Sequence, residues 1–191
     1  FKKIEAQKDG RRRPNLRIAR ITQVDPHPSG EKLYLLTVSL GEEKRRIVAG
    51  IKEWYAPEEL TGRFIVVVTN LKPATIRGIE SRGMLLAAEG NRHPCSLIVP
   101  SGEVKEGDPV AGCECDETID INEFRSFDLK VGGITNDGML ELDGRGYKLS
   151  EKEPPGEVVI DATSKDRPTI LRCNGRPLVP LKVVGMGAKV L

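Results

Sequence analysis

The sequence of 191 residues contains few aromatic side chains, only two histidines and four cysteines, and no long apolar segment. No apolar run approaches the roughly 18 residues that a transmembrane helix requires, and no targeting segment is visible. Secreted proteins that depend on disulfides usually carry a signal sequence, so four cysteines without one are expected to be reduced thiols. These absences argue against a membrane protein or a secreted scaffold and predict a cytoplasmic protein.

The few groups that bind metals or act as nucleophiles are poorly spaced for chemistry. Zinc sites commonly use cysteines that are separated by two to four residues, but a single residue separates Cys113 from Cys115. No Ser-His-Asp set, glycine-rich phosphate loop or paired metal ligands are recognisable. His27 lies between two prolines, without a second ligand at a useful spacing, and is expected to be a structural turn residue. We therefore expect no catalytic residue, no metal and no cofactor.

Basic residues are concentrated near the start of the chain. The 30 Lys and Arg side chains and the 28 Asp and Glu side chains give a net charge of only +2, but residues 1–20 alone carry +6. Residues 1–14 are predicted to form a basic arm or linker, because their composition is too polar for a core. The arm offers six side chains for auxiliary, sequence-independent phosphate contacts: Lys2, Lys3, Lys8, Arg11, Arg12 and Arg13.

From residue 15 onward, short apolar segments alternate with turn signals. Strands are expected at residues 16–24, 33–40, 45–51, 63–69 and, in two pieces, 75–88. Pro57 and the acidic residues after it predict a single helical turn, because proline suits the first turn of a helix and acids suit its positive end. Five strands, with one short helix between the third and the fourth, predict a five-stranded OB-fold barrel over residues 15–118. The exposed face of such a barrel commonly binds oligonucleotides.

The stretch from Ile65 to Ala88 combines the pattern of a buried strand with basic side chains. Its apolar run IVVV is followed by NLKP at residues 70–73, where asparagine and proline favour a turn. Lys72, Arg77 and Arg82 therefore cluster near strand ends. Charged groups placed on turns by a rigid scaffold are typical of a binding surface.

Several stretches of the first half resemble, in order, the signature of the tRNA-binding domain family found in appendages of aminoacyl-tRNA synthetases. They are NLRI at 15–18, HPSGEKLY at 27–34, RRIVAGI at 45–51, NLKP at 70–73 and RGIESRGMLLAA at 77–88. The family includes the C-terminal domain of methionyl-tRNA synthetases and endothelial monocyte-activating polypeptide II. The resemblance covers about residues 15–110 and implies an OB-fold that binds tRNA.

Nine side chains are candidates for contact with tRNA. Lysine and arginine neutralise phosphates, asparagine and serine form hydrogen bonds with base edges or the ribose hydroxyl, and methionine offers an apolar platform for a base. Structural alternatives stay open, since Asn70 would also cap a turn and Met84 would also pack in a core. Arg45 and Arg46 are adjacent in a strand, so only one of them can share the binding face. The candidates are Lys32, Arg45, Arg46, Asn70, Lys72, Arg77, Ser81, Arg82 and Met84.

Residues 119–191 are predicted to form a smaller β-rich C-terminal domain. The sequence DINE at residues 120–123 favours a capped helix, but residues 127–131 alternate like a strand, and both interpretations stay open. In the cytokine-related branch of the family, a C-terminal domain substitutes for the second subunit of dimeric relatives. The resemblance therefore implies a monomer with a pseudo-dimer interface rather than a homodimer.

Together these features imply a non-catalytic module that recognises the shape and backbone of tRNA. Such a module would deliver tRNA to an aminoacyl-tRNA synthetase, either in cis as an appendage or in trans as a stand-alone cofactor. The alternative is a chaperone-like or signalling module of the same fold, which would bind a protein partner. The two differ in their response to salt, because binding to phosphates weakens steeply with ionic strength and a mainly apolar peptide site responds little.

Overall fold

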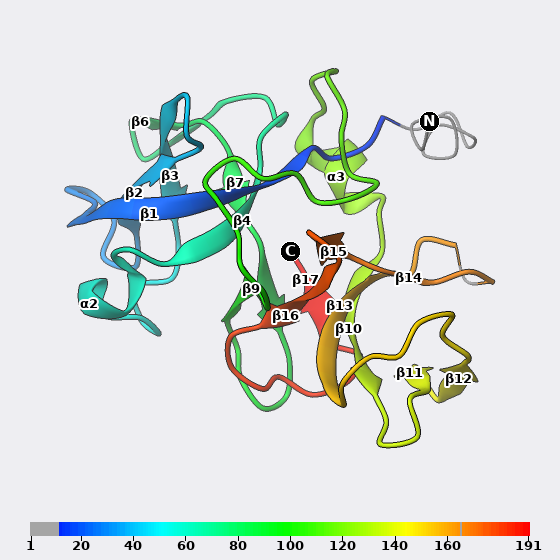
Figure 1. Ribbon diagram of the computed structural model, residues 1–191. Coiled ribbons are helices and arrows are strands. Elements are labelled where there is room, and N and C mark those ends of the chain that lie inside the picture. Colours follow the sequence, from blue (N-terminus) through cyan, green and yellow to red (C-terminus); the bar gives the residue numbers. More distant parts are fainter. Residues whose placement is uncertain (1–11, 165) are drawn as a thin grey trace.

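The structure is a computed structural model that describes residues 12–164 and 166–191, in two β-rich halves that lie side by side (Figure 1). The first half contains β1 (Leu16–Pro26), β2 (Tyr34–Ser39), β3 (Lys44–Ala49), α2 (Pro57–Leu60), β4 (Phe64–Val68), β5 (Ala74–Ile76), β6 (Ile79–Ser81), β7 (Met84–Leu85), β8 (Ala87–Glu89) and β9 (Ser96–Pro100). The second half contains α3 (Ile121–Arg125), β10 (Leu129–Ile134), β11 (Leu140–Leu142), β12 (Arg145–Tyr147), β13 (Gly156–Asp161), β14 (Thr169–Ile170), β15 (Arg172–Cys173), β16 (Arg176–Pro180) and β17 (Lys189–Val190).

Five antiparallel strands form the barrel sheet of the first half, in the spatial order β3-β2-β1-β4-β7. The long strand β1 pairs with β4 through its first half and with β2 through its second half, and the register shifts between Ile21 and Gln23. The short helix α2 follows β3, with Pro57 in its first turn and the Glu59 carboxylate accepting a hydrogen bond from the Ala56 N–H at 3.1 Å. The predicted fold class, a mainly β chain with a five-stranded barrel sheet and a short helix, is confirmed.

Strand β4 is buried on both of its faces, which explains its unbroken apolar sequence. Ile65 and Val67 belong to the core inside the barrel, together with side chains from β1, β2 and β3. Val66 and Val68 alternate with them and belong to a second core, which also contains side chains from the C-terminal half. Because successive residues of a strand point to opposite faces, only an apolar run can fill two cores at once.

The C-terminal half continues the β structure of the first half. Strand β17 pairs with β8, and β16 pairs with β9, so a path of hydrogen-bonded strands joins the two halves. Their shared core contains Leu16, Ile18 and Leu86 from the first half and Phe124 and Val131 from the second. The division of the chain at residues 118 and 119 stays a prediction, and what the structure shows is that the second half covers an apolar face of the barrel.

The ambiguous region after residue 119 contains both of the elements that its sequence favours. Helix α3 begins after Asp120, whose carboxylate accepts a hydrogen bond from the Glu123 N–H at 2.8 Å, and the Glu123 side chain bonds back to the Asp120 N–H. This reciprocal pair is a capping box. Strand β10 begins only four residues after the helix ends, so the helical and the extended pattern are both real and adjacent.

All four cysteines are free thiols, and three of them, Cys95, Cys113 and Cys173, are buried. Burial away from water disfavours a thiolate and raises the pKa of Cys113 to about 12. Such a thiol packs as a small apolar side chain and does not act as a nucleophile. Among the helices of the described ranges, none is long and apolar enough to cross a membrane.

Candidate nucleic-acid interface

The most prominent feature near the predicted site is a small hairpin formed by β5 and β6, at the upper left of Figure 1. Ile76 pairs with Ile79, which leaves Arg77 and Gly78 as a two-residue turn. Both turn residues have positive φ angles, 50° for Arg77 and 85° for Gly78, as in a type I′ turn. Glycine adopts this conformation freely, but arginine is strained in it, so the hairpin holds a basic side chain at its exposed tip in an unfavourable backbone conformation.

Exposed basic side chains lie on the hairpin and on the strands and turns that flank it. The backbone N–H of Arg82, between β6 and β7, donates to the carbonyl of Arg46 in β3 at 2.9 Å, so these two residues are neighbours. The first three residues of β3 alternate in exposure, and the exposed positions, 44 and 46, are both basic. Sequence reasoning missed the first of these, because the strand was expected to begin at residue 45. The exposed cations of the region are Lys44, Arg46, Lys72, Arg77 and Arg82.

The side chain of Arg45 points away from the exposed side of β3 and bonds to neighbouring parts of the barrel. Its guanidinium donates to the carbonyls of Thr69 at 2.6 Å and Arg82 at 3.4 Å, and it forms an ion pair with Glu43 at 3.0 Å. Its side chain is only 16% exposed. As the strand geometry requires, only one of the adjacent pair, Arg46, faces solvent. The geometry of Arg45 favours a structural role over a phosphate contact.

The Asn70 side chain forms hydrogen bonds that join the end of β4 to two other segments of the chain. Its side-chain oxygen accepts a hydrogen bond from the Asn15 N–H at 2.8 Å. Its side-chain nitrogen donates to the carbonyls of Arg13 at 2.9 Å and Glu117 at 2.8 Å. Both donor hydrogens are therefore engaged with backbone, which favours the structural alternative over the reading of a base.

Three further candidates occupy different kinds of position. Ser81 is buried, accepts from the Val48 N–H at 3.0 Å and donates to the Gly83 carbonyl at 3.1 Å, so it ties the hairpin to β3. Met84 is partly buried and packs against the core shared by the two halves. Lys32 is exposed but forms an ion pair with Glu53 at 3.1 Å.

The last basic residues of the predicted arm are engaged with the C-terminal half. The Arg12 guanidinium donates to both carboxylate oxygens of Glu123, at 2.8 and 2.5 Å, and these contacts raise its pKa above the ordinary value. Arg13 forms an ion pair with Asp161 at 3.3 Å and lies 5.3 Å from the centre of the Phe127 ring. The geometry of both side chains favours a structural role. The other arm candidates, Lys2, Lys3, Lys8 and Arg11, lie outside the described residues.

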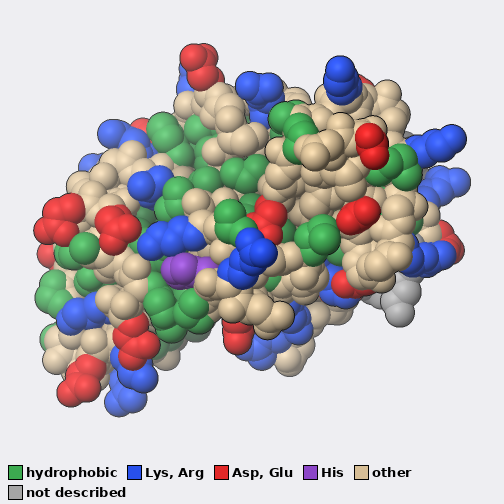
Figure 2. All heavy atoms as spheres, turned by 90° about the horizontal axis from the view of Figure 1, so that it is seen from below, with side chains coloured by type: hydrophobic (Ala, Val, Ile, Leu, Met, Phe, Trp, Pro, Cys, Tyr) green, Lys and Arg blue, Asp and Glu red, His purple; other side chains and the backbone are tan. Residues whose placement is uncertain are grey.

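The end of the molecule opposite to the hairpin has a mixed character. Figure 2 shows acidic and basic side chains interspersed with apolar ones on this face, which gives no extended patch of one sign.

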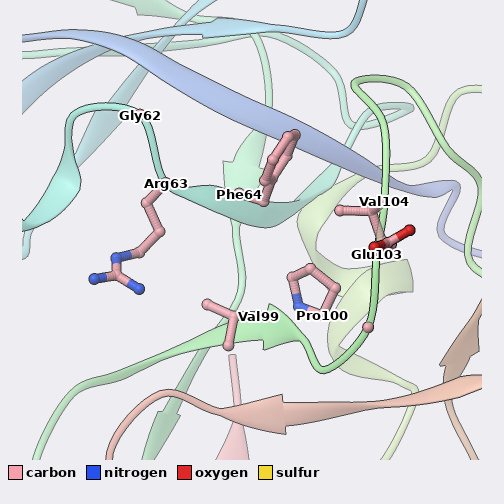
Figure 3. Close-up of a pocket in the computed structure, with 8 residues that line it drawn as sticks. Gly62, Arg63, Phe64, Val99, Pro100, Glu103 and Val104 are labelled. Carbon is pink, nitrogen blue, oxygen red and sulfur yellow. The ribbon is translucent and has the colours of Figure 1, made fainter.

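An open hollow of about 560 Å³ lies between the α2–β4 turn and the end of β9. Figure 3 shows Arg63 and Glu103 on opposite sides of this hollow, with Phe64, Val99 and Pro100 between them. Because the two charged groups have opposite signs, the hollow offers no net attraction to a phosphate.

The barrel and the basic residues around its hairpin define an OB-fold module of the kind that binds oligonucleotides. Residues 16–109 match the family model described as "Putative tRNA binding domain", and this part of the chain belongs to that family. It is similar to the methionine–tRNA ligases of Pyrococcus furiosus (49% identity over 96 residues) and Thermotoga maritima (50% identity over 97 residues). The two alignments cover 50% and 51% of this chain but only 13% and 15% of the relatives.

The fold of the whole chain also has a counterpart among solved structures. The C-terminal domain of Plasmodium vivax p43 aligns with 94% of this chain and 97% of its own length, with a TM-score of 0.57 and 18% sequence identity. This likeness concerns the fold alone. It shows that a barrel followed by a β-rich second half is an arrangement that occurs in another protein.

Proposed function

We propose that this chain is a non-catalytic module that binds tRNA through its phosphate backbone. The observation that carries the proposal is the group of exposed cations around the β5–β6 hairpin, within the part of the chain that belongs to the tRNA-binding family: Lys44, Arg46, Lys72, Arg77 and Arg82. Phosphate oxygens accept strong, charge-assisted hydrogen bonds from lysine and arginine. Contacts of this kind fix the position of an RNA but carry little sequence information.

The engaged polar residues are the scaffold of this surface. Asn70, Ser81 and Arg45 use their donors on backbone carbonyls and thereby fix the ends of β4 and β6. A-form RNA presents few readable base edges to side chains, so a rigid surface of cations selects for the spacing of phosphates. We propose that the module recognises the shape of tRNA and discriminates weakly among different tRNAs.

The partner that we propose is an aminoacyl-tRNA synthetase in the cytoplasm. The similarity to a short part of methionine–tRNA ligases supports an appendage in cis or a cofactor in trans. A tethered binding module raises the local concentration of tRNA near the catalytic domain, so it increases productive encounters without performing chemistry itself.

Replacing Lys72 by Ala is expected to weaken tRNA binding by roughly 1–3 kcal/mol, the scale of a charge-assisted hydrogen bond. The side chain of Lys72 is exposed, so the melting temperature should not change. Filter binding with bulk tRNA, over a range of salt concentrations, measures the effect. The steep salt dependence of the parent chain also separates this function from the chaperone-like alternative.

The matched control is Asn70→Ala, which removes a neighbouring polar side chain that is engaged with the backbone. It should lower the free energy of unfolding by about 1–3 kcal/mol, because three backbone groups lose a hydrogen-bond partner, and leave the affinity of the folded fraction close to that of the parent. Unchanged tRNA affinity in the Lys72 variant would refute its assignment to the binding surface.

Deleting residues 1–11 is expected to flatten the dependence of log affinity on log salt while the preference for tRNA over duplex RNA persists. The deleted segment is basic, and its one aromatic residue, Phe1, precedes the cations and is not interleaved with them, so phosphate attraction is the mechanism that its composition supports. The deletion stops before Arg12, because Arg12 and Arg13 hold the C-terminal half. Loss of the preference for tRNA would show instead that the deleted residues recognise the shape of tRNA.

A further inference from the structure

The loop that contains His27 contacts the β5–β6 hairpin directly. His27 is only 5% exposed, and its Nε2 lies 3.1 Å from the carbonyl oxygen of Ile76, the residue immediately before Arg77. On the other side of the ring, the Ser29 N–H donates to Nδ1 at 2.9 Å. The expectation that His27 is a structural turn residue is confirmed by these two hydrogen bonds, but its second partner is the hairpin.

The two contacts indicate which tautomer the ring adopts. A backbone N–H can only donate, so Nδ1 carries no hydrogen, and a carbonyl oxygen can only accept, so the hydrogen resides on Nε2. The backbone of the loop is itself fixed, because the His27 N–H donates to the Leu33 carbonyl at 3.1 Å and the Leu33 N–H to the Gly30 carbonyl at 3.2 Å. His27 therefore joins a rigid loop of the barrel to the base of the turn that presents Arg77.

The hairpin needs such support because it is short and because Arg77 is unfavourable at its position in the turn. Strands β5 and β6 contain only three residues each, and an isolated hairpin of this length is unstable in water. Arg77 adds backbone strain at φ 50°. The Ser81 hydroxyl holds the far end of the hairpin to Val48, and the His27 ring holds the end next to the turn.

We propose that His27 is a positioning residue for RNA binding, which holds the hairpin so that the Arg77 guanidinium is presented to a phosphate. The inference rests on the proposed function, because it requires that Arg77 contact the RNA. It assigns a role in binding to a buried side chain that does not itself touch the ligand.

Two substitutions of His27 separate its two hydrogen bonds. In His27→Gln the side-chain nitrogen lies near the position of Nε2 and retains the donor to Ile76, whereas the acceptor for Ser29 is lost. In His27→Asn the side-chain oxygen lies near the position of Nδ1 and retains the acceptor for Ser29, whereas the donor to the hairpin is lost. Each variant loses one hydrogen bond, so their melting temperatures should fall by similar amounts.

Only His27→Asn should weaken tRNA binding, by about 3- to 10-fold, which is the scale of one hydrogen bond in a binding equilibrium. Hydrogen exchange of residues 74–81 should accelerate in the same variant and remain slow in His27→Gln. Equal affinities of the two variants, or a loss of affinity in His27→Gln alone, would overturn the proposal.

A double-mutant cycle with Arg77→Asn tests whether His27 acts through Arg77. Asparagine tolerates positive φ, so this change removes the charge and preserves the turn. If the hairpin is positioned for the sake of Arg77, adding His27→Asn to Arg77→Asn should cause no further loss of affinity. Independent, additive losses would overturn the positioning role. If Arg77→Asn alone leaves the affinity unchanged, Arg77 does not contact the RNA. This outcome refutes the assignment of Arg77 to the binding surface, and with it the positioning role of His27.

Discussion

Simultaneous replacement of four exposed cations around the hairpin, as Arg46→Gln, Lys72→Gln, Arg77→Asn and Arg82→Gln, is expected to weaken tRNA binding by on the order of 10³-fold at low salt. Each contact with a phosphate contributes about tenfold, and contacts on one ligand are not fully additive. The slope of log affinity against log salt should become shallower by about 3, because fewer counterions are released on binding when fewer phosphates are contacted. Filter binding at several salt concentrations measures both quantities.

The control for this variant carries the same loss of charge at the other end of the chain, on the β-rich C-terminal half. Arg145, Lys148, Lys152 and Arg167 are exposed there, and replacing all four by Gln lowers the net charge equally. If attraction depended only on net charge, the two variants would lose affinity by the same factor. Equal losses would therefore contradict a localised binding surface around the hairpin.

We expect the complete chain to be a monomer, and truncation after Thr118 to yield a dimer or an aggregate. It would expose apolar side chains that are 0% exposed in the complete chain, among them Leu16, Ile18, Val66, Val68, Leu86 and Ile98. At about 1.5–3 kcal/mol for each fully buried aliphatic side chain, the lost burial is comparable to the whole stability of a typical domain. Light scattering and binding of an apolar dye would detect the outcome.

A pair of substitutions in β4 tests whether the exposed apolar face causes the self-association of the truncated chain. Val66→Lys lies on the face that truncation exposes, so it should destabilise the complete chain but improve the solubility of the truncated one. Val67→Lys lies inside the barrel and should destabilise both. Dimerisation of the complete chain through its barrel would refute the prediction that the C-terminal half occupies the surface used for self-association.

The sequence contained enough information to predict the barrel because the relevant signals are local. The β-branched run at 65–68, the turn signal at 70–73 and the proline-led helical turn at 57–60 each depend on neighbouring residues only. The capping box at residues 120–123 is another such signal. The order of these elements, with one short helix between the third and the fourth of five strands, separates an OB-fold from other small β proteins, and the family resemblance agrees with it.

The role of each polar candidate could not be predicted, because it depends on which distant groups surround the side chain. Asn70 is next to the basic Lys72 in sequence, but its amide lies among the backbone groups of Asn15, Arg13 and Glu117. Arg45 and Arg46 are chemically identical, and the pleat of β3 turns one towards Thr69 and the other towards solvent.

The sequence by itself therefore determined the class of the protein, the location of the first four strands of the barrel and the presence of basic groups in one region of it. The tertiary structure alone decided which of these groups are exposed, that the C-terminal half shares a core with the barrel, and that His27 lies against the hairpin. The physical reason is that strand and turn preferences arise from interactions between near neighbours, whereas exposure and hydrogen-bond partners are fixed only when segments tens of residues apart pack together.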